Sequence, residues 1–247
     1  MQTKGNTVLI TGGGSGLGKA LAHKLHDSGN TVIIAGRRLD MLQAAIEGRA
    51  DMHAIGFDAE NAEGIEDFVK RILADFPSLN ILINNAGIMR YEDITSRRDL
   101  SDVEAHVATN LVGPIRLIDA LVDHLKAQPN AVIINVTSGL AFVPLQAAAT
   151  YSATKAALHS YTVSLRHALA GSVEVIEWAP PAVRTHLTPG QEKIEAFMPL
   201  GEFISESMSL LSQQPTPEEI IVERAKFQRN AERENRFSQT LKTLNSR

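Results

Sequence analysis

The chain has 247 residues, of which 44% are hydrophobic and 21% charged, and its formal net charge is -4. This composition predicts a globular protein, and the length suits one large α/β domain or two small ones. A weakly negative chain has no electrostatic reason to bind nucleic acid or an anionic membrane, and no apolar run approaches the roughly 20 residues of a membrane span. The absence of cysteine excludes disulfides and thiolate metal sites, and it fits a cytoplasmic location.

A glycine-rich loop follows the first predicted strand. Thr7–Thr11 is a short β-branched run typical of a buried strand, and apolar residues at helical spacing follow over 17–25. The loop between them contains Gly12, Gly14, Ser15, Gly16, Leu17 and Gly18. Free N–H groups at a helix start attract anions, and glycine lets the backbone approach them. We therefore expect nucleotide phosphates to bind here; a flexible turn is the alternative.

The second predicted strand, 31–35, closes a β-α-β unit and ends at Gly36-Arg37-Arg38. In NAD-binding units an acidic residue commonly binds the ribose 2′-hydroxyl in this region. Two arginines occupy it here, and a guanidinium group can pair a 2′-phosphate through two hydrogen bonds. The sequence therefore favours NADP(H) over NAD(H), with a solvated arginine pair as the alternative.

Helices and strands alternate through the middle of the chain. Helices are expected at 40–47, 62–76, 99–125 and 151–169, and strands at 52–57, 80–83, 131–136 and 173–178. This alternation predicts one doubly wound α/β domain. Asp58 ends the third strand, where it can reach an adenine edge. Asn85, Ala86 and Gly87 follow the fourth strand, and such small and amide residues suit close contact with a ligand.

The helical pattern 99–125 is interrupted at Gly113-Pro114. Proline has no N–H to bond the carbonyl four residues back, which belongs to Asn110. We expect a kink at this point and a spare backbone acceptor that a water could use. A kink that merely fits the packing is equally consistent with these residues.

Tyr151 and Lys155 lie four residues apart in a helical pattern without glycine or proline, so they share one helix face. A cation beside a phenol lowers the pKa of the phenol, which makes tyrosine a usable proton donor near neutral pH. Ser138 follows the fifth strand, at the edge where open α/β sheets bind ligands. The same Tyr–Lys spacing also occurs by chance on solvated helices.

Two segments complete the chain. Scattered apolar residues, prolines and glycines over about 186–214 predict a mobile substrate-covering segment in which Met198, Leu200 and Phe203 touch substrate. Helical spacing in the tail favours a docked C-terminal helix, with a strand at 219–222 as the competing prediction. No metal site is expected, because no third ligand completes the pair His23 and His26.

These motifs resemble the short-chain dehydrogenase/reductase family over about residues 5–185. The motifs are Thr11-Gly12-x-x-x-Gly16-x-Gly18, Asn84-Asn85-Ala86-Gly87, Asn110, Ser138 and Tyr151-x-x-x-Lys155. The Gly-Arg-Arg turn and the tail also resemble the DltE-type branch. The resemblance implies a single-domain Rossmann fold over 1–247 with a doubly wound parallel sheet of about seven strands flanked by helices. It also implies a nicotinamide cofactor and a homodimer or homotetramer built on two long helices.

The family pattern implies a role for each matching residue. Tyr151 would exchange a proton with the substrate oxygen, and Lys155 would lower its pKa and bind the nicotinamide ribose. Ser138 would hydrogen-bond the reacting oxygen, and Asn110 would hold a water through its backbone. The expected cofactor-binding residues are Gly12, Gly14, Ser15, Gly16, Leu17, Gly18, Arg37, Arg38, Asp58, Asn85, Ala86, Gly87, Tyr151, Lys155, Val183 and Thr185.

The sequence departs from the family where Pro180-Pro181 replaces the usual Pro-Gly. Proline fixes φ at about -65°, whereas glycine adopts many values of φ. The sequence alone therefore does not decide whether Val183 and Thr185 contact the cofactor. The glycine pair that usually follows the last strand is also missing.

The resulting prediction is an NADP(H)-dependent oxidoreductase. It would move hydride between nicotinamide and a carbonyl or secondary alcohol of a small organic substrate. A non-catalytic NADP(H)-binding redox sensor is the alternative, because a fold does not fix a function.

Overall fold

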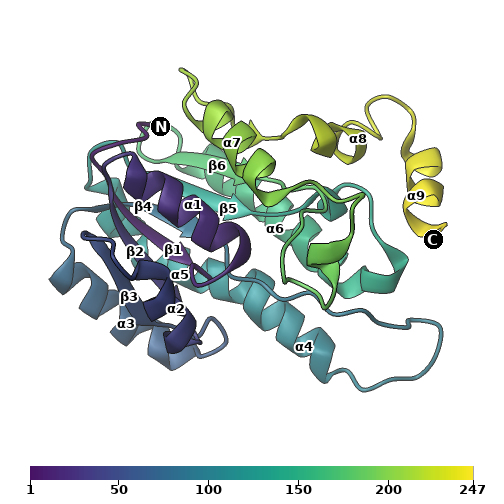
Figure 1. The fold of residues 1–247 in the computed structure, drawn as a ribbon, viewed down its shortest axis with the longest axis horizontal. Helices are drawn as coiled ribbons and strands as arrows, with labels where there is room; N and C mark the ends of the chain where they lie inside the picture. Colours follow the sequence, from purple (N-terminus) through teal and green to yellow (C-terminus); the bar gives the residue numbers. More distant parts are fainter. Residues whose placement is uncertain (247) are drawn as a thin grey trace.

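Seven parallel strands form the centre of the computed structural model, which describes residues 1–246 (Figure 1). They are β1 (Thr7–Thr11), β2 (Thr31–Gly36), β3 (Met52–Gly56), β4 (Leu79–Asn84), β5 (Val132–Val136), β6 (Glu174–Trp178) and β7 (Glu219–Ile220). Their order in the sheet is β3-β2-β1-β4-β5-β6-β7. The six strands predicted from apolar and β-branched runs are confirmed to within one residue at each end. The order reverses between β1 and β4, and open sheets bind ligands at such a point.

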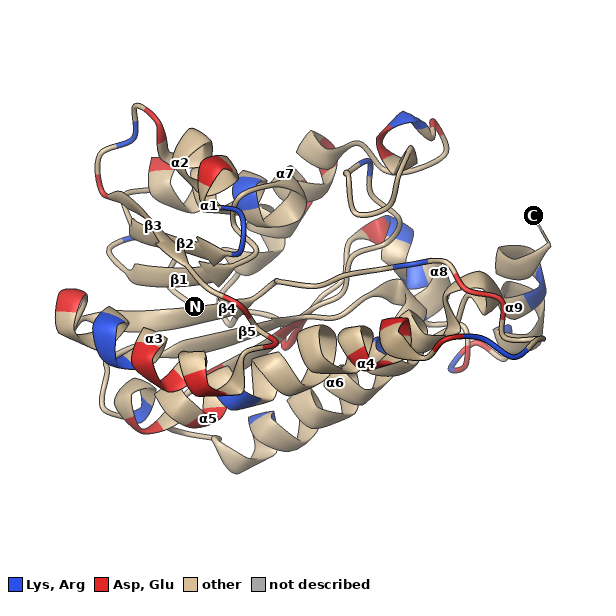
Figure 2. Ribbon diagram, turned by 90° about the horizontal axis from the view of Figure 1, so that it is seen from below, with Lys and Arg blue, Asp and Glu red and all other residues tan. Residues whose placement is uncertain are grey.

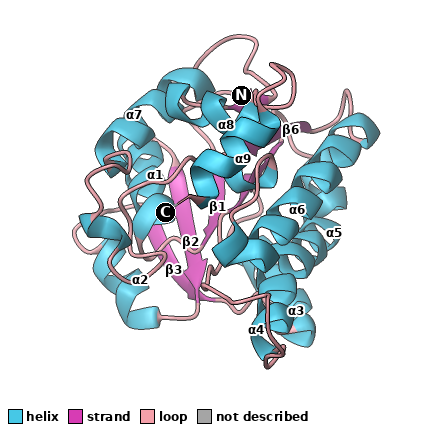
Figure 3. Ribbon diagram, turned by 90° about the vertical axis from the view of Figure 1, so that its right-hand side faces the viewer, coloured by secondary structure: helices cyan, strands magenta, loops and turns pink. Residues whose placement is uncertain are grey.

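Helices cover both faces of the sheet (Figure 2). They are α1 (Gly16–Asp27), α2 (Leu39–Ile46), α3 (Ala62–Asp75), α4 (Ser101–Val107), α5 (Gly113–Lys126), α6 (Ala149–Ala168), α7 (Leu200–Leu211), α8 (Lys226–Arg229) and α9 (Phe237–Asn245). Helices α1, α2 and α7 lie on one face, and α3, α5 and α6 lie on the other (Figure 3). Of residues 1–246, no helix has both the length and the apolar character needed to cross a bilayer.

Two separate apolar cores result from this arrangement. Successive side chains of a strand point to opposite faces of a sheet. Val8 and Ile10 therefore pack with α1, α2 and α7, while Leu9 between them packs with α3 and α5. All three side chains are fully buried, as expected for a sheet covered on both faces.

A π-helical turn, Ala108–Val112, joins α4 to α5. The N–H of Gly113 bonds the carbonyl of Ala108, five residues back, and Pro114 follows at once. The interruption expected at Gly113-Pro114 is therefore present, as one wide turn. Asn110 lies within it and is fully buried. Turns of this kind occur often at functional sites.

The expectation of a cover over 186–214 is wrong for its second half. Phe203 is fully buried in α7, and its ring stacks on Trp178 with centroids 5.2 Å apart. Met198 is 4% exposed, and Leu200 packs against the same core. Leu200 and Phe203 belong to an amphipathic helix that contacts α1, and Met198 lies just before that helix. None of these three side chains lines the cavity described below.

The tail forms a short strand before it becomes helical. Ile220 is fully buried in β7, and its carbonyl accepts from the N–H of Ala179 beside β6. The strand prediction at 219–222 is thus confirmed at 219–220, and one continuous helix across this region is wrong. Helix α9 ends against the loop before α6, where Asn245 donates to the carbonyl of Pro144 at 3.1 Å.

Candidate active site

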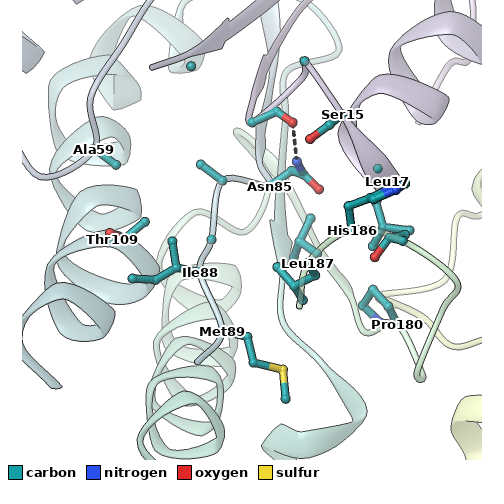
Figure 4. Close-up of a pocket in the computed structure, with 18 of the residues that line it drawn as sticks. Ser15, Leu17, Ala59, Asn85, Ile88, Met89, Thr109, Pro180, His186 and Leu187 are labelled. Atoms are coloured by element: carbon teal, nitrogen blue, oxygen red, sulfur yellow. Dashed lines mark hydrogen bonds between the residues drawn. The ribbon is translucent and has the colours of Figure 1, made fainter. Parts of the chain in front are cut away.

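A cavity of about 440 Å³ lies at the carboxyl ends of the strands, where the loops after β1, β2, β4, β5 and β6 converge. Figure 4 shows Asn85 near its centre, with Ser15 and Leu17 on one side and Thr109 on the other. The predicted site residues that line it are Gly12, Gly14, Ser15, Gly16, Leu17, Arg37, Arg38, Asp58, Asn85, Ala86, Gly87, Ser138, Tyr151, Lys155, Val183 and Thr185. Gly18 and Asn110 lie behind its wall. The fold therefore brings together sixteen of the predicted residues, from Gly12 to Thr185.

Hydrogen bonds fix the glycine loop against the segment after β4. The Thr11 hydroxyl accepts from the N–H groups of Asn85 and Ala86 at 3.1 and 3.0 Å. The Asn85 amide donates back to the Thr11 carbonyl at 2.9 Å and to the Gly12 carbonyl at 3.3 Å, and Figure 4 draws the second of these bonds. Two glycines allow this close approach. A Cβ on Gly12, which has φ +68°, would lie 2.9 Å from the Ala86 Cα, and one on Gly18 would lie 2.4 Å from the Gly12 carbonyl oxygen.

The start of α1 fits a phosphate group. Its N-cap, Ser15, makes no side-chain hydrogen bond to the helix, and the first turn contains no acidic residue. The N–H groups at a helix start have no partner within the helix and carry partial positive charge. With Gly14 and Gly16 lining the cavity beside them, these groups suit a pyrophosphate anion.

The two arginines after β2 already have partners on the protein. Arg37 pairs with Glu60 at 3.1 Å, and Arg38 donates to the Ser15 hydroxyl at 3.3 Å. The Glu60 carboxylate also accepts from Thr109 at 2.8 Å. An exposed ion pair is worth at most about 1 kcal/mol, so a phosphate can compete for Arg37. Glu60 and Thr109 carried no local sequence signal, because they come from distant loops.

The side chains of Tyr151 and Lys155 converge on the cavity next to Ser138. The Lys155 ammonium lies 5.7 Å from the centre of the Tyr151 ring, and both side chains are buried. Lys155 donates to the Val136 carbonyl at 2.7 Å, and Ser138 lines the same cavity beside the phenol. One helix face thus presents a phenol and an amine to the end of β5.

Burial controls the ionisation of this pair. It raises the pKa of Tyr151 to about 12, which the neighbouring Ser138 side chain offsets only in part. It lowers the pKa of Lys155 to about 8. Desolvation is thus the largest influence on the pKa of this phenol in the protein alone, and the lowering expected from Lys155 stays a prediction. At neutral pH the phenol keeps its proton, which is the form that a proton donor requires.

Lys155 gives the protein a pH-dependent stability. Because its folded pKa, about 8, lies below that of an exposed lysine, the unfolded chain binds more protons between about pH 8 and 10. The free energy of unfolding should rise over this window by on the order of 3 kcal/mol and the rise should be absent in Lys155→Met. Urea unfolding at pH 7, 8.5 and 10 measures it. The matched variant Lys24→Met, at an exposed site, should keep the rise; an equal rise in Lys155→Met would contradict the assignment.

The sequence was compared with models of known protein families. The family model described as short chain dehydrogenase matches residues 6–195, which is well over half of the chain. The chain belongs to this family. It is 43% identical over 189 residues to the uncharacterized oxidoreductase DltE of Bacillus subtilis, covering 76% of this chain and 75% of that one. This likeness supports the DltE-type branch of the short chain dehydrogenases.

Two solved structures share the fold and hold a cofactor. One, from Burkholderia cenocepacia in complex with NADP, has a TM-score of 0.83 and 25% identity and covers 98% of this chain and 99% of its own. The other is a 3-ketoacyl-(acyl-carrier-protein) reductase from Brucella melitensis complexed with NADH. Its TM-score is 0.77 and its identity 25%, and it covers 87% of this chain and 94% of its own. Members of the family thus bind either nucleotide.

The side chain of Asn110 does more than the family pattern implied. Its carbonyl oxygen accepts from the Ile88 N–H at 2.8 Å, and its amide donates to the Ile88 carbonyl at 2.9 Å. These bonds tie the π turn to the loop after β4. Ile88 lines the cavity, so Asn110 supports the wall from behind. The sequence showed only its backbone, because the paired partner lies 22 residues earlier.

Gln191 holds the loop that follows β6 in this dehydrogenase. Its amide donates to the Val183 carbonyl at 2.8 Å and to the Thr185 hydroxyl at 3.2 Å. Val183 also pairs with Met198 in an isolated bridge. Val183 and Thr185 therefore line the cavity although Pro181 replaces the usual glycine. Sequence reasoning missed Gln191 and several other residues of the wall, among them Ile88, Met89, Arg90, His186 and Leu187.

Proposed function

We propose that this short chain dehydrogenase is an NADP(H)-dependent oxidoreductase that reduces a carbonyl group or oxidises a secondary alcohol on a small organic molecule. One observation carries the proposal. A single cavity joins a glycine-lined helix start, suited to a pyrophosphate, to a buried protonated phenol beside an amine. Nucleotide binding and proton donation therefore act on the same enclosed space.

The residues around the phenol supply the proton chemistry. In reduction, Tyr151 donates its proton to the carbonyl oxygen, while the Ser138 hydroxyl hydrogen-bonds the same oxygen. The nicotinamide, when bound, supplies the hydride that reaches the carbonyl carbon. The Lys155 ammonium stabilises the phenolate that forms, and solvent later returns a proton to it. One hydride and one proton convert the carbonyl to the alcohol, and oxidation runs the same steps in reverse.

A screen of aldehydes and ketones with NADPH tests this proposal. Loss of absorbance at the reduced nicotinamide band, together with formation of the alcohol, is the expected result. Tight NADPH binding without turnover of any carbonyl or alcohol would contradict it and would favour the sensor. The medium-sized, partly apolar wall formed by Ile88, Met89 and Leu187 guides the choice of compounds.

The preference for NADP(H) is proposed to rest on Arg37 and Arg38. Replacing both by alanine should raise the Kd for NADPH by about 10- to 100-fold, since a hydrogen bond to a charged group is worth about 1.5–3 kcal/mol. The Kd for NADH should change little, because NADH has no 2′-phosphate. Fluorescence titration with both nucleotides measures the two values. Arg71→Ala, on the exposed surface of α3, is the matched control; equal weakening of both nucleotides would contradict the assignment.

A further inference from the structure

The segment from Gly87 to Leu100 crosses from β4 to α4 without a helix or strand of its own, and it extends past α4 in Figure 1. Its first residues form part of the cavity wall. Asn110 fixes it at Ile88, and His106 accepts from the Arg90 N–H at 3.1 Å. Both anchors connect the segment to the helical stretch 101–112. A third anchor connects it to the helix that bears Tyr151.

That third anchor is Glu92. One of its carboxylate oxygens accepts from the backbone N–H of Thr150, and the other accepts from the Thr150 hydroxyl at 2.8 Å. The Glu92 N–H also donates to the Ala147 carbonyl at 2.9 Å. Three hydrogen bonds thus join one residue of the segment to the first turn of α6 and the residues just before it.

The Glu92 carboxylate caps the start of α6, which has no capping side chain of its own. The helix begins at Ala149 after an alanine N-cap that offers no side-chain acceptor, and its first turn contains no acidic residue. Free N–H groups at a helix start are stabilised by an acceptor and by negative charge. Glu92 supplies both from 58 residues earlier in the chain.

The charge of Glu92 is maintained although its side chain is only 10% exposed. Burial alone would raise the pKa of this carboxyl, but hydrogen bonds from Thr150 and Arg98 hold it below its ordinary value. Arg98 pairs with the carboxylate from the same segment, and its own side chain is 26% exposed. The anchor is therefore a carboxylate that stays ionised at neutral pH and is paired with Arg98.

We infer that Glu92 is a positioning residue, which sets the start of α6, and with it Tyr151, against the cavity wall at Ile88 and Arg90. Thr150 and Tyr151 are consecutive, so a change at the carboxylate acts on the phenol directly and reaches the glycine loop, at the far end of the cavity, last. This inference rests on the proposed function, because it assigns Glu92 to the proton-donating half of that site.

Glu92→Gln tests the inference, because an amide keeps the size but has only one acceptor oxygen and no charge. We expect kcat for carbonyl reduction to fall about 10-fold, because a misplaced phenol that raises the activation free energy by about 1.4 kcal/mol slows the reaction tenfold. The Kd for NADPH should stay within about twofold. Asp93→Asn makes the same chemical change one residue later, where the carboxylate bonds only Thr95 and Ser96, and should leave kcat unchanged. A Glu92→Gln enzyme with wild-type kcat overturns the inference, whatever its melting temperature.

Variants of Thr150 test the same contact from the helix. Thr150→Val removes the hydroxyl that Glu92 accepts from and should lower kcat, whereas Thr150→Ser keeps the hydroxyl and should restore it. Equal kcat for the two variants would count against the contact. These variants keep the carboxylate and the backbone N–H, so the fold is disturbed less than by Glu92→Gln.

Amide hydrogen exchange gives a readout that needs no substrate. In Glu92→Gln, exchange across residues 149–153 should quicken by about tenfold, while exchange across 160–168 stays as in the wild type. If the wild type reduces no carbonyl, the proposed function fails, but hydrogen exchange still tests whether Glu92 stabilises the start of α6. Unchanged exchange at 149–153 overturns the inference.

Discussion

Tyr151→Phe should lower kcat for carbonyl reduction by about 10²- to 10⁴-fold, the contribution typical of a positioned proton donor. The phenol is buried, its pKa is raised to about 12, and it faces the cavity beside Ser138, so it holds a proton at neutral pH where the substrate oxygen is proposed to bind. Phenylalanine keeps the ring that packs there. The Kd for NADPH should therefore stay within about twofold, and the enzyme should remain folded.

Steady-state rates with saturating NADPH and a reducible carbonyl measure this effect. Tyr161→Phe is the matched control, because Tyr161 lies on the same helix, is half-buried and does not line the cavity. It should retain wild-type kcat. Survival of more than about one tenth of the rate in Tyr151→Phe would exclude Tyr151 as the proton donor.

Gly18→Ala should weaken NADPH binding by at least about 100-fold and destabilise the protein by about 1–3 kcal/mol, as overpacking does. The added Cβ would lie 2.4 Å from the Gly12 carbonyl oxygen and 2.4 Å from the Asn85 amide nitrogen. Neither atom can retreat easily, because one is backbone and the other is bonded to Thr11. The start of α1 must then move away from the loop that it supports.

Calorimetric titration with NADPH and thermal unfolding measure the two effects. Gly201→Ala makes the same change near the start of α7, where a Cβ meets no atom within 4 Å. Alanine is the better helix former by about 1 kcal/mol, so this control should bind NADPH normally and gain slight stability. Normal NADPH affinity in Gly18→Ala would contradict the role of the close contact.

Local sequence patterns were sufficient for most of the fold and much of the site. Short β-branched runs marked the six long strands, because strands buried on both faces need apolar side chains throughout. Tyr151 and Lys155 were predictable as a pair, since a helix fixes the direction of residues four apart. The glycine loop was predictable from its position between a strand and a helix.

The remaining features depend on contacts between distant segments. The sequence predicted a substrate cover where α7 lies, because the partners of its apolar residues, Trp178 and α1, are distant in the chain. Strand β7 has two residues, too few for a periodic pattern, so the sequence offered it only as the competing prediction to a helix. The raised pKa of Tyr151 follows from burial, which no spacing reveals. Glu60 and Gln191 likewise join the site through partners that only the folded chain brings close.

The two apolar cores on opposite faces of the sheet divide the enzyme into two independently adjustable halves. Helix α1, which opens the phosphate loop, rests on one core, and α6, which bears the phenol and the amine, rests on the other. The sheet lies between the two cores, so α1 and α6 share no cluster of apolar side chains. Variants selected for a new coenzyme and variants selected for a new reaction rate should therefore combine with nearly additive effects, which makes recombination of separate libraries a practical route to altered catalysts.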